Sequence, residues 1–119
     1  MLKGIGCDVV EISRIKSLLP KDGFMDKVYT AAEREFIAAK KAETAAGMWA
    51  AKEAVSKALG TGFCGFFMRD IEILHDQMGR PFAKLRGRAR AIADDRGIKA
   101  IHISISHDRD IAMAFAVAE

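Results

Sequence analysis

Two runs of alternating apolar side chains near the end of the chain constrain its fold more than any other feature. Isoleucine recurs at positions 101, 103 and 105, and large apolar residues recur at every second position from 111 to 117. A period of two is typical of a β-strand, because successive side chains point to opposite faces. The polar segment H-D-R-D at residues 107–110 separates the runs and predicts a closing antiparallel hairpin.

The second strand of this hairpin carries no charge on either face. Large apolar side chains occupy one face, and alanines occupy the other. A strand without charge on either face is typically covered on both sides. The pattern fits a subunit interface, and it fits a two-sided core within one chain equally well.

Helical patterns dominate the first half of the chain. The best-defined helix is predicted over residues 44–59, an alanine-rich segment followed by Gly60 where a helix-ending glycine belongs. Another helix is predicted over residues 12–19, and the capping-box pattern T-A-A-E predicts a helix that begins at Thr30. A short basic helix is predicted over residues 87–96.

The chain is expected to open with a strand over residues 2–10. Cys7 lies on the face of this strand opposite Asp8 and is expected in the core. Gly4 and Gly6 share the face of Asp8 and are expected to leave room for a ligand.

A second hairpin is predicted from strands around residues 71–73 and 81–85, with His75 and Asp76 solvated near its turn. Helices gather early in the chain and strands mostly late. This order predicts the α+β class, with an antiparallel sheet packed with helices in a single small domain over residues 1–119.

Composition excludes several classes of protein. A chain of 119 residues suits one domain, and 50% hydrophobic with 29% charged residues excludes global disorder. No uncharged run is long enough to span a membrane, and no signal peptide is recognisable. Two cysteines make neither a disulfide framework nor a zinc site, so we expect a cytoplasmic protein with free thiols. A net charge of +3 permits nucleic acid, an acidic protein or a phosphorylated ligand.

Three charged side chains are candidates for chemistry. Asp8 stands in an otherwise apolar strand, where it fits either a surface acid at the strand end or a metal ligand. Glu53 and Lys57 have the spacing of a solvated ion pair on a helix. Beside Trp49 and a glycine-rich loop they also suit a metal-bound phosphate, although the glycines follow the helix and make no P-loop.

His107 ends a predicted strand within the segment S-I-S-H-D. A Ser/His/Asp hydrolase is disfavoured, because no nucleophile elbow is present and neighbours in sequence do not make a triad. A structural turn histidine and a donor to a phosphate both remain compatible with the pattern.

Two segments resemble the signatures of phosphopantetheinyl transferases. They are G-I-G-C-D-V-V-E-I at residues 4–12 and W-A-A-K-E-A-V-S-K-A at residues 49–58. The short chain and S-I-S-H-D at residues 104–108 resemble the small bacterial class, the holo-acyl-carrier-protein synthase family. The resemblance covers essentially the whole chain.

The resemblance implies an enzyme of fatty acid biosynthesis. It would move the 4′-phosphopantetheine arm from coenzyme A to a serine of apo-acyl carrier protein and release adenosine 3′,5′-bisphosphate. It implies Mg²⁺ held by Asp8 and Glu53. Larger, two-lobed relatives carry an acid where this chain has Val10, so waters would replace that ligand. A homotrimer with sites between subunits is also implied.

The resemblance assigns further roles residue by residue. Lys57 joins Asp8 and Glu53 in the catalytic set and, like His107, contacts the phosphates of coenzyme A. Arg14 meets acidic residues of the carrier protein, in agreement with the basic helix around it. Either Glu53 or a metal-bound water would serve as the general base, and the resemblance does not choose between them. The remaining expected substrate-binding residues are Gly60, Arg80 and Pro81.

Two functions of other classes compete with this hypothesis. One is a small basic RNA-binding module that would use the arginines of residues 86–90 and the aromatic loop of residues 63–67. The other is a scaffolding trimer that binds coenzyme A without catalysis. We expect neither nucleic acid nor membrane among the partners.

Overall fold

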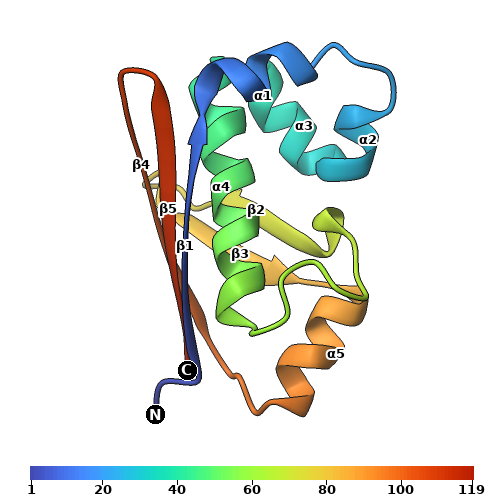
Figure 1. Ribbon diagram of the computed structural model, residues 1–119, viewed down its shortest axis with the longest axis vertical. Coiled ribbons are helices and arrows are strands. Elements are labelled where there is room, and N and C mark those ends of the chain that lie inside the picture. Colours follow the sequence, from blue (N-terminus) through green and yellow to red (C-terminus); the bar gives the residue numbers. More distant parts are fainter.

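The computed structural model describes all residues from 1 to 119 (Figure 1). Its elements, in chain order, are β1 (Gly4–Glu11), α1 (Ile12–Leu18), α2 (Phe24–Val28), α3 (Ala31–Ala38), α4 (Ala42–Ala58), the 3₁₀ turn η1 (Met68–Asp70), β2 (Ile71–His75), β3 (Pro81–Leu85), α5 (Gly87–Asp95), β4 (Ile101–Asp108) and β5 (Ile111–Ala118).

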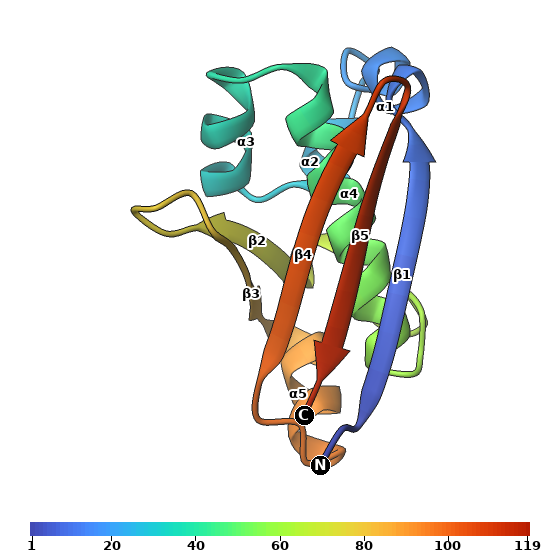
Figure 2. The same ribbon diagram turned by 90° about the vertical axis from the view of Figure 1, so that its left-hand side faces the viewer.

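The predicted α+β class is confirmed. Strands β1, β5 and β4 form one antiparallel sheet with β5 in the centre, and β2 and β3 form a separate antiparallel pair. Helix α4 lies along one face of the larger sheet, and the β2–β3 hairpin packs against α4 and β4 (Figures 1 and 2). No helix is both long enough and apolar enough to cross a membrane.

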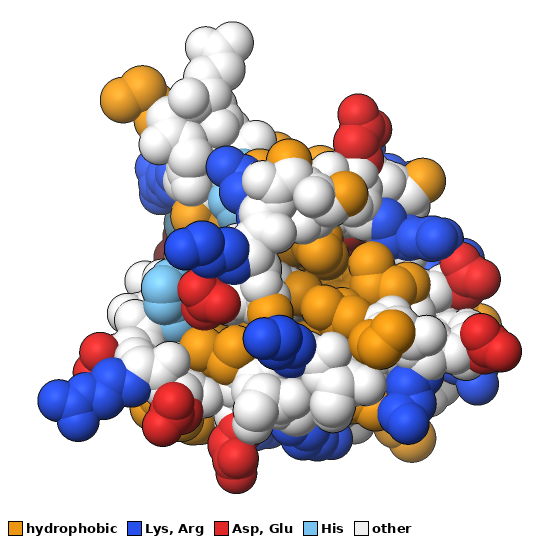
Figure 3. Space-filling view, turned by 90° about the horizontal axis from the view of Figure 1, so that it is seen from above, with side chains coloured by type: hydrophobic (Ala, Val, Ile, Leu, Met, Phe, Trp, Pro, Cys, Tyr) orange, Lys and Arg blue, Asp and Glu red, His pale blue; other side chains and the backbone are white.

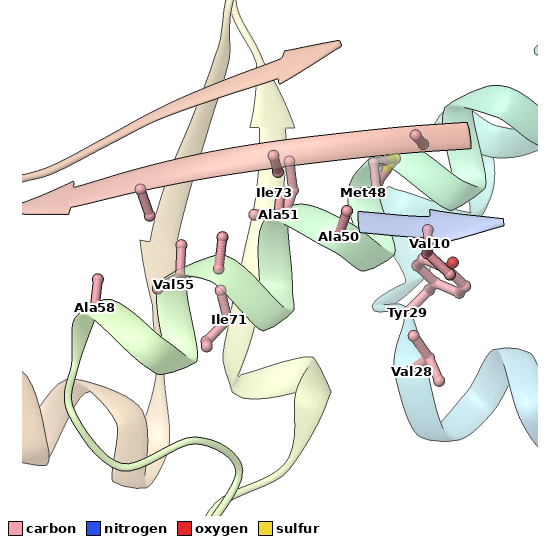
Figure 4. Packing of buried hydrophobic residues seen from close by; sticks show 14 of the residues in the cluster. Val10, Val28, Tyr29, Met48, Ala50, Ala51, Val55, Ala58, Ile71 and Ile73 are labelled. Atoms are coloured by element: carbon pink, nitrogen blue, oxygen red, sulfur yellow. The ribbon is translucent and has the colours of Figure 1, made fainter. Parts of the chain in front are cut away.

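The alanines of the closing hairpin let α4 approach the sheet closely. Those of β5 point inward and are buried, as are most alanines of α4 (Figure 4). A Cβ atom on Gly4 or Gly6 would overlap the backbone carbonyl of Ala58 or Ala54 in α4. These glycines therefore serve strand–helix packing, and the expectation that they leave room for a ligand is wrong.

The opposite face of this sheet is uncovered. In Figure 2 it faces the viewer with no helix in front of it. Cys7 is exposed there, so its predicted place in the core is wrong, as is a two-sided core around β5. We call this surface the outer face; its apolar members from β1 and β5 are Ile5, Cys7, Val9, Ile111, Met113, Phe115 and Val117.

The capping and glycine patterns predict the ends of these helices to within about two residues of their positions in the structure. Thr30 caps α3 as predicted: its hydroxyl accepts from the Glu33 amide, and the Glu33 carboxylate accepts from the Thr30 amide at 2.8 Å. Helix α4 begins at residue 42 instead of 44. Neither α2 nor η1 is predicted from the sequence, because a segment of five residues or fewer shows too little periodicity.

Glu72 lies on β2 and is buried between two donors. The Thr30 hydroxyl donates to one carboxylate oxygen, and the Arg86 guanidinium donates to the other at 2.7 and 3.1 Å. Burial by itself would raise the pKa of Glu72, but the hydrogen bonds from Thr30 and Arg86 hold it below its ordinary value of 4.5.

Glu72→Gln should lower the stability of the fold at neutral pH by about 1 to 3 kcal/mol, because it removes a charge-assisted pair. A lowered folded-state pKa stabilises the protein above the unfolded-state value and is lost as the pH falls through the folded-state value. The gap between wild type and variant should therefore shrink in acid. Urea unfolding at pH 7, 5 and 3 measures this gap, and a gap that is constant with pH would contradict the assignment.

Candidate functional site

Asp8 and Lys57 meet where β1 crosses the last turns of α4. The Lys57 Nζ atom lies 3.3 Å from Asp8 Oδ1 and donates to the Cys7 carbonyl at 2.8 Å. The close glycine packing of β1 brings these side chains within reach. The Lys57 side chain keeps about half of its surface exposed, so its ammonium remains accessible to a ligand.

Glu53 lies one turn before Lys57 and joins this pair. Partial burial and the neighbouring Asp8 carboxylate raise the pKa of Glu53, and the cations Lys57 and Arg14 oppose that rise. The two carboxylates are therefore close enough to repel each other. We call Asp8, Glu53 and Lys57 the acidic site.

The donor set of the acidic site fits Mg²⁺. No group of three or more His, Cys, Asp or Glu side chains is positioned to hold a metal ion. Mg²⁺ does not require such a cage, because it commonly takes one or two carboxylates and completes its shell with water and substrate phosphate. A divalent cation would also relieve the repulsion between Asp8 and Glu53.

An aromatic pocket of about 620 Å³ is connected to the acidic site through α4, because Trp49 lines the pocket one turn before Glu53. The Trp49 ring stacks on Phe24 with centroids 5.8 Å apart, and the Arg14 guanidinium lies 5.7 Å from the Trp49 centroid. Seen from above, hydrophobic side chains are visible in a hollow bordered by charged ones (Figure 3). The apolar side chains that line the pocket are Phe24, Val28, Trp49, Phe63, Phe66, Phe67 and Met68.

A second pocket, of about 390 Å³, contains His107 and Pro81. We call it the β4 pocket. Lys40 and Thr44 also line it, and sequence reasoning missed both, because residues from α3 through β4 meet only in the fold. The expectation that His75 is solvated is wrong: its ring is partly buried and stacks on Phe36 with centroids 4.1 Å apart.

Arg80 and Gly60 line neither the β4 pocket nor the aromatic pocket. Arg80 borders a neighbouring hollow of about 270 Å³ that it shares with Pro81. Gly60 follows α4 with a φ of 86°, where glycine is favoured, and the Arg96 guanidinium donates to the preceding Leu59 carbonyl.

The acidic site and the β4 pocket lie on opposite flanks of α4. The first uses β1 and the second uses β4, and these strands are the two edges of the sheet. Thr44 and Glu53 are nine residues apart on α4, which is about 2.5 turns and therefore half a rotation. One chain does not bring the two groups together.

Comparisons with known proteins all find relatives of one family. A family model described as the 4′-phosphopantetheinyl transferase superfamily matches residues 4–116. The holo-[acyl-carrier-protein] synthase of Clostridium acetobutylicum is 48% identical over 122 residues, covering 100% of this chain and 98% of the relative. The solved structure of holo-[acyl-carrier-protein] synthase from Neisseria meningitidis has a TM-score of 0.89 at 37% identity, covering 100% of this chain and 99% of that one. The Helicobacter pylori holo-[acyl-carrier-protein] synthase in complex with coenzyme A has a TM-score of 0.86 at 31% identity, with 97% and 99% covered.

Proposed function

Because this chain belongs to the 4′-phosphopantetheinyl transferase superfamily, within its holo-acyl-carrier-protein synthases, we propose that residues 1–119 form one Mg²⁺-dependent transferase domain. The enzyme transfers a phosphopantetheine arm to apo-acyl carrier protein. The donor is coenzyme A, and the second product is adenosine 3′,5′-bisphosphate. The holo carrier protein then serves fatty acid biosynthesis in the cytoplasm, where exposed free thiols such as Cys7 and Cys64 stay reduced.

The meeting of Asp8 and Glu53 carries this proposal. Their carboxylates are far apart in the sequence but interact in the fold, with Lys57 beside them. Mg²⁺ bound by these two carboxylates would neutralise the diphosphate of the donor. The Lys57 ammonium contacts a phosphate oxygen and stabilises the charge that develops there. The carrier serine attacks the phosphorus that bears the pantetheine arm, and the bond from that phosphorus to the nucleotide phosphate breaks.

The β4 pocket is suited to the nucleotide end of the donor. His107 and Lys40 supply donors for phosphate, and Pro81 supplies an apolar wall. Arg80 adjoins this pocket through Pro81 and is proposed as a neighbour of the nucleotide. Gly60 lies in the turn that follows Lys57, and it is proposed to contact the substrate there.

The first contact with the carrier protein is proposed on α1. Arg14 and Lys16 are exposed there, and Arg14 lies over Trp49 one turn before Glu53. Positive side chains beside the acidic site are complementary to an acidic partner and guide its approach.

A homotrimer would complete the site. The acidic site and the β4 pocket lie at opposite edges of the sheet, so neighbouring copies are needed to place them against one donor molecule. The outer face provides an uncovered apolar surface for such contacts, with Met113 and Phe115 still 41% and 44% exposed. These two observations support a trimer whose sites lie between subunits.

Phe115→Lys should convert the assembly to monomers that retain their fold, because this side chain lies on the outer face of the isolated chain. We expect at least tenfold lower activity, since the two halves of each site would separate. Analytical ultracentrifugation measures the assembly, and Leu2→Lys is the control, because it places the same charge on an exposed apolar position that precedes β1. A Phe115→Lys trimer with full activity would argue against this interface.

Incubation with apo-acyl carrier protein and coenzyme A tests the function as a whole. With Mg²⁺, intact-mass spectrometry should show the carrier protein gain one phosphopantetheine group, and chromatography should show adenosine 3′,5′-bisphosphate. Addition of EDTA should stop both. Salt-sensitive RNA binding without transfer would favour the RNA-binding module, and coenzyme A binding without transfer would favour the scaffold.

A further inference from the structure

Lys52 stands next to Glu53 in the signature segment, yet its side chain points into the protein. The side chain is 0% exposed. Its ammonium donates to Glu33 Oε1 at 2.8 Å and to the carbonyls of Met68 and Ile71 at 3.0 and 2.6 Å. All three ammonium protons are used, so Lys52 has none left for a substrate.

The Glu33 carboxylate extends this buried connection. It accepts from the Thr30 amide at the start of α3 and from the Ile73 amide in β2, both at 2.8 Å. The side chain of Glu33 is also 0% exposed. The ion pair between Lys52 and Glu33, with its hydrogen bonds, thus connects α3, η1 and β2 to the middle of α4.

The Met68 carbonyl is the contact that connects this ion pair to the candidate site. Phe66, Phe67 and Met68 are consecutive residues that line the aromatic pocket together with Trp49 of α4, and we call them the aromatic wall. Lys52 and Trp49 are three residues apart on α4, so the hydrogen bond from Lys52 to the Met68 carbonyl ties the end of this wall to the same segment of α4 that carries Trp49.

We infer that Lys52 is a positioning residue that holds this aromatic wall in place for engagement of the carrier protein. The inference rests on the proposed function, because Arg14, the proposed carrier contact, lies over Trp49. The β4 pocket lies on the other flank of α4 and does not depend on the wall. Loss of Lys52 should therefore raise the KM for carrier protein and leave the binding of coenzyme A unchanged.

A double variant separates positioning from stability. Lys52→Met alone leaves the Glu33 charge buried and unpaired, which is strongly destabilising. Lys52→Met combined with Glu33→Gln removes both charges. In the folded double variant we expect the KM for carrier protein to rise at least tenfold, with kcat and the calorimetric Kd for coenzyme A within threefold of wild type. Lys99→Met is the matched control, and Arg14→Glu is the comparator for weakened carrier binding.

Hydrogen exchange of the unmodified enzyme gives a second measurement. The Asp70 amide of η1 donates to the Phe67 carbonyl at 2.9 Å, and we expect it to exchange as slowly as amides in the centre of α4. Rapid exchange at Asp70 would overturn the inference even if the double variant fails to fold. A folded double variant with a wild-type KM for carrier protein would also overturn it. Absence of transfer by wild type would instead refute the proposed function.

Discussion

Glu53→Gln should slow arm transfer by about 10²- to 10³-fold while the protein remains folded. The amide keeps the size of the side chain but loses the charge that would hold Mg²⁺ against the donor diphosphate. The effect should fall on the metal-dependent rate, so we expect activity to stay low even at high Mg²⁺ concentration. Steady-state assays across a Mg²⁺ titration measure this result.

The same substitution should not destabilise the fold. Burial and the Asp8 carboxylate raise the pKa of Glu53, which means that folding disfavours its charged form. A raised carboxyl pKa makes the folded state relatively more stable below the unfolded-state value, and this gain is lost as the pH rises. Removal of the charge at neutral pH should therefore leave the thermal midpoint equal or slightly higher.

A matched control distinguishes the loss of charge at the acidic site from the loss of one negative charge elsewhere on the protein. Glu35 is exposed on α3, and Glu35→Gln makes the same chemical change outside the acidic site. It should retain wild-type activity. If Glu53→Gln turned over at the wild-type rate, Glu53 would have no place in the site.

Gly6→Ala should lower stability by about 1 to 3 kcal/mol or more and reduce activity at least tenfold. The added Cβ would overlap the Ala54 carbonyl oxygen and approach the Ala58 amide nitrogen, and neither can move without a shift of α4. That shift would separate Asp8 from Glu53 and Lys57. Urea unfolding measures the stability loss, and a raised Mg²⁺ requirement in the assay would report the altered acidic site.

Gly47→Ala serves as a graded control for this prediction. A Cβ at Gly47 meets only the Cγ2 methyl of Ile105, a side chain that can adjust. We expect a smaller loss of stability than for Gly6→Ala. Equal losses at the two positions would show that the backbone overlap at Gly6 is not the cause.

Local patterns predicted the elements better than they predicted which face of an element is buried. The alternation in β5 and the capping box at Thr30 depend on neighbours in sequence, and both predictions are confirmed. The alternating pattern of β1 correctly predicts that Cys7 and Asp8 lie on opposite faces of the strand. It could not show which face is covered, because that depends on α4, about 50 residues further along the chain.

The candidate site was predictable only in part, for the same reason. Asp8, Glu53 and Lys57 stand in signature segments, so the resemblance could name them, and the fold brings them together. Lys40 stands in no such segment and reaches the β4 pocket only through the packing of α3, α4 and the strands. The internal role of Lys52 depends on Met68 and Ile71, contacts that no local pattern indicates.

The separation of the acidic site from the β4 pocket has a genetic consequence. Glu53 belongs to the acidic site beside β1 and His107 belongs to the β4 pocket, so defects at these two residues would damage opposite flanks of α4. In the proposed trimer, copies of both kinds would co-assemble, and some sites between subunits would combine an intact acidic site from one copy with an intact β4 pocket from its neighbour. Two alleles that are each inactive alone would then complement one another within a mixed oligomer.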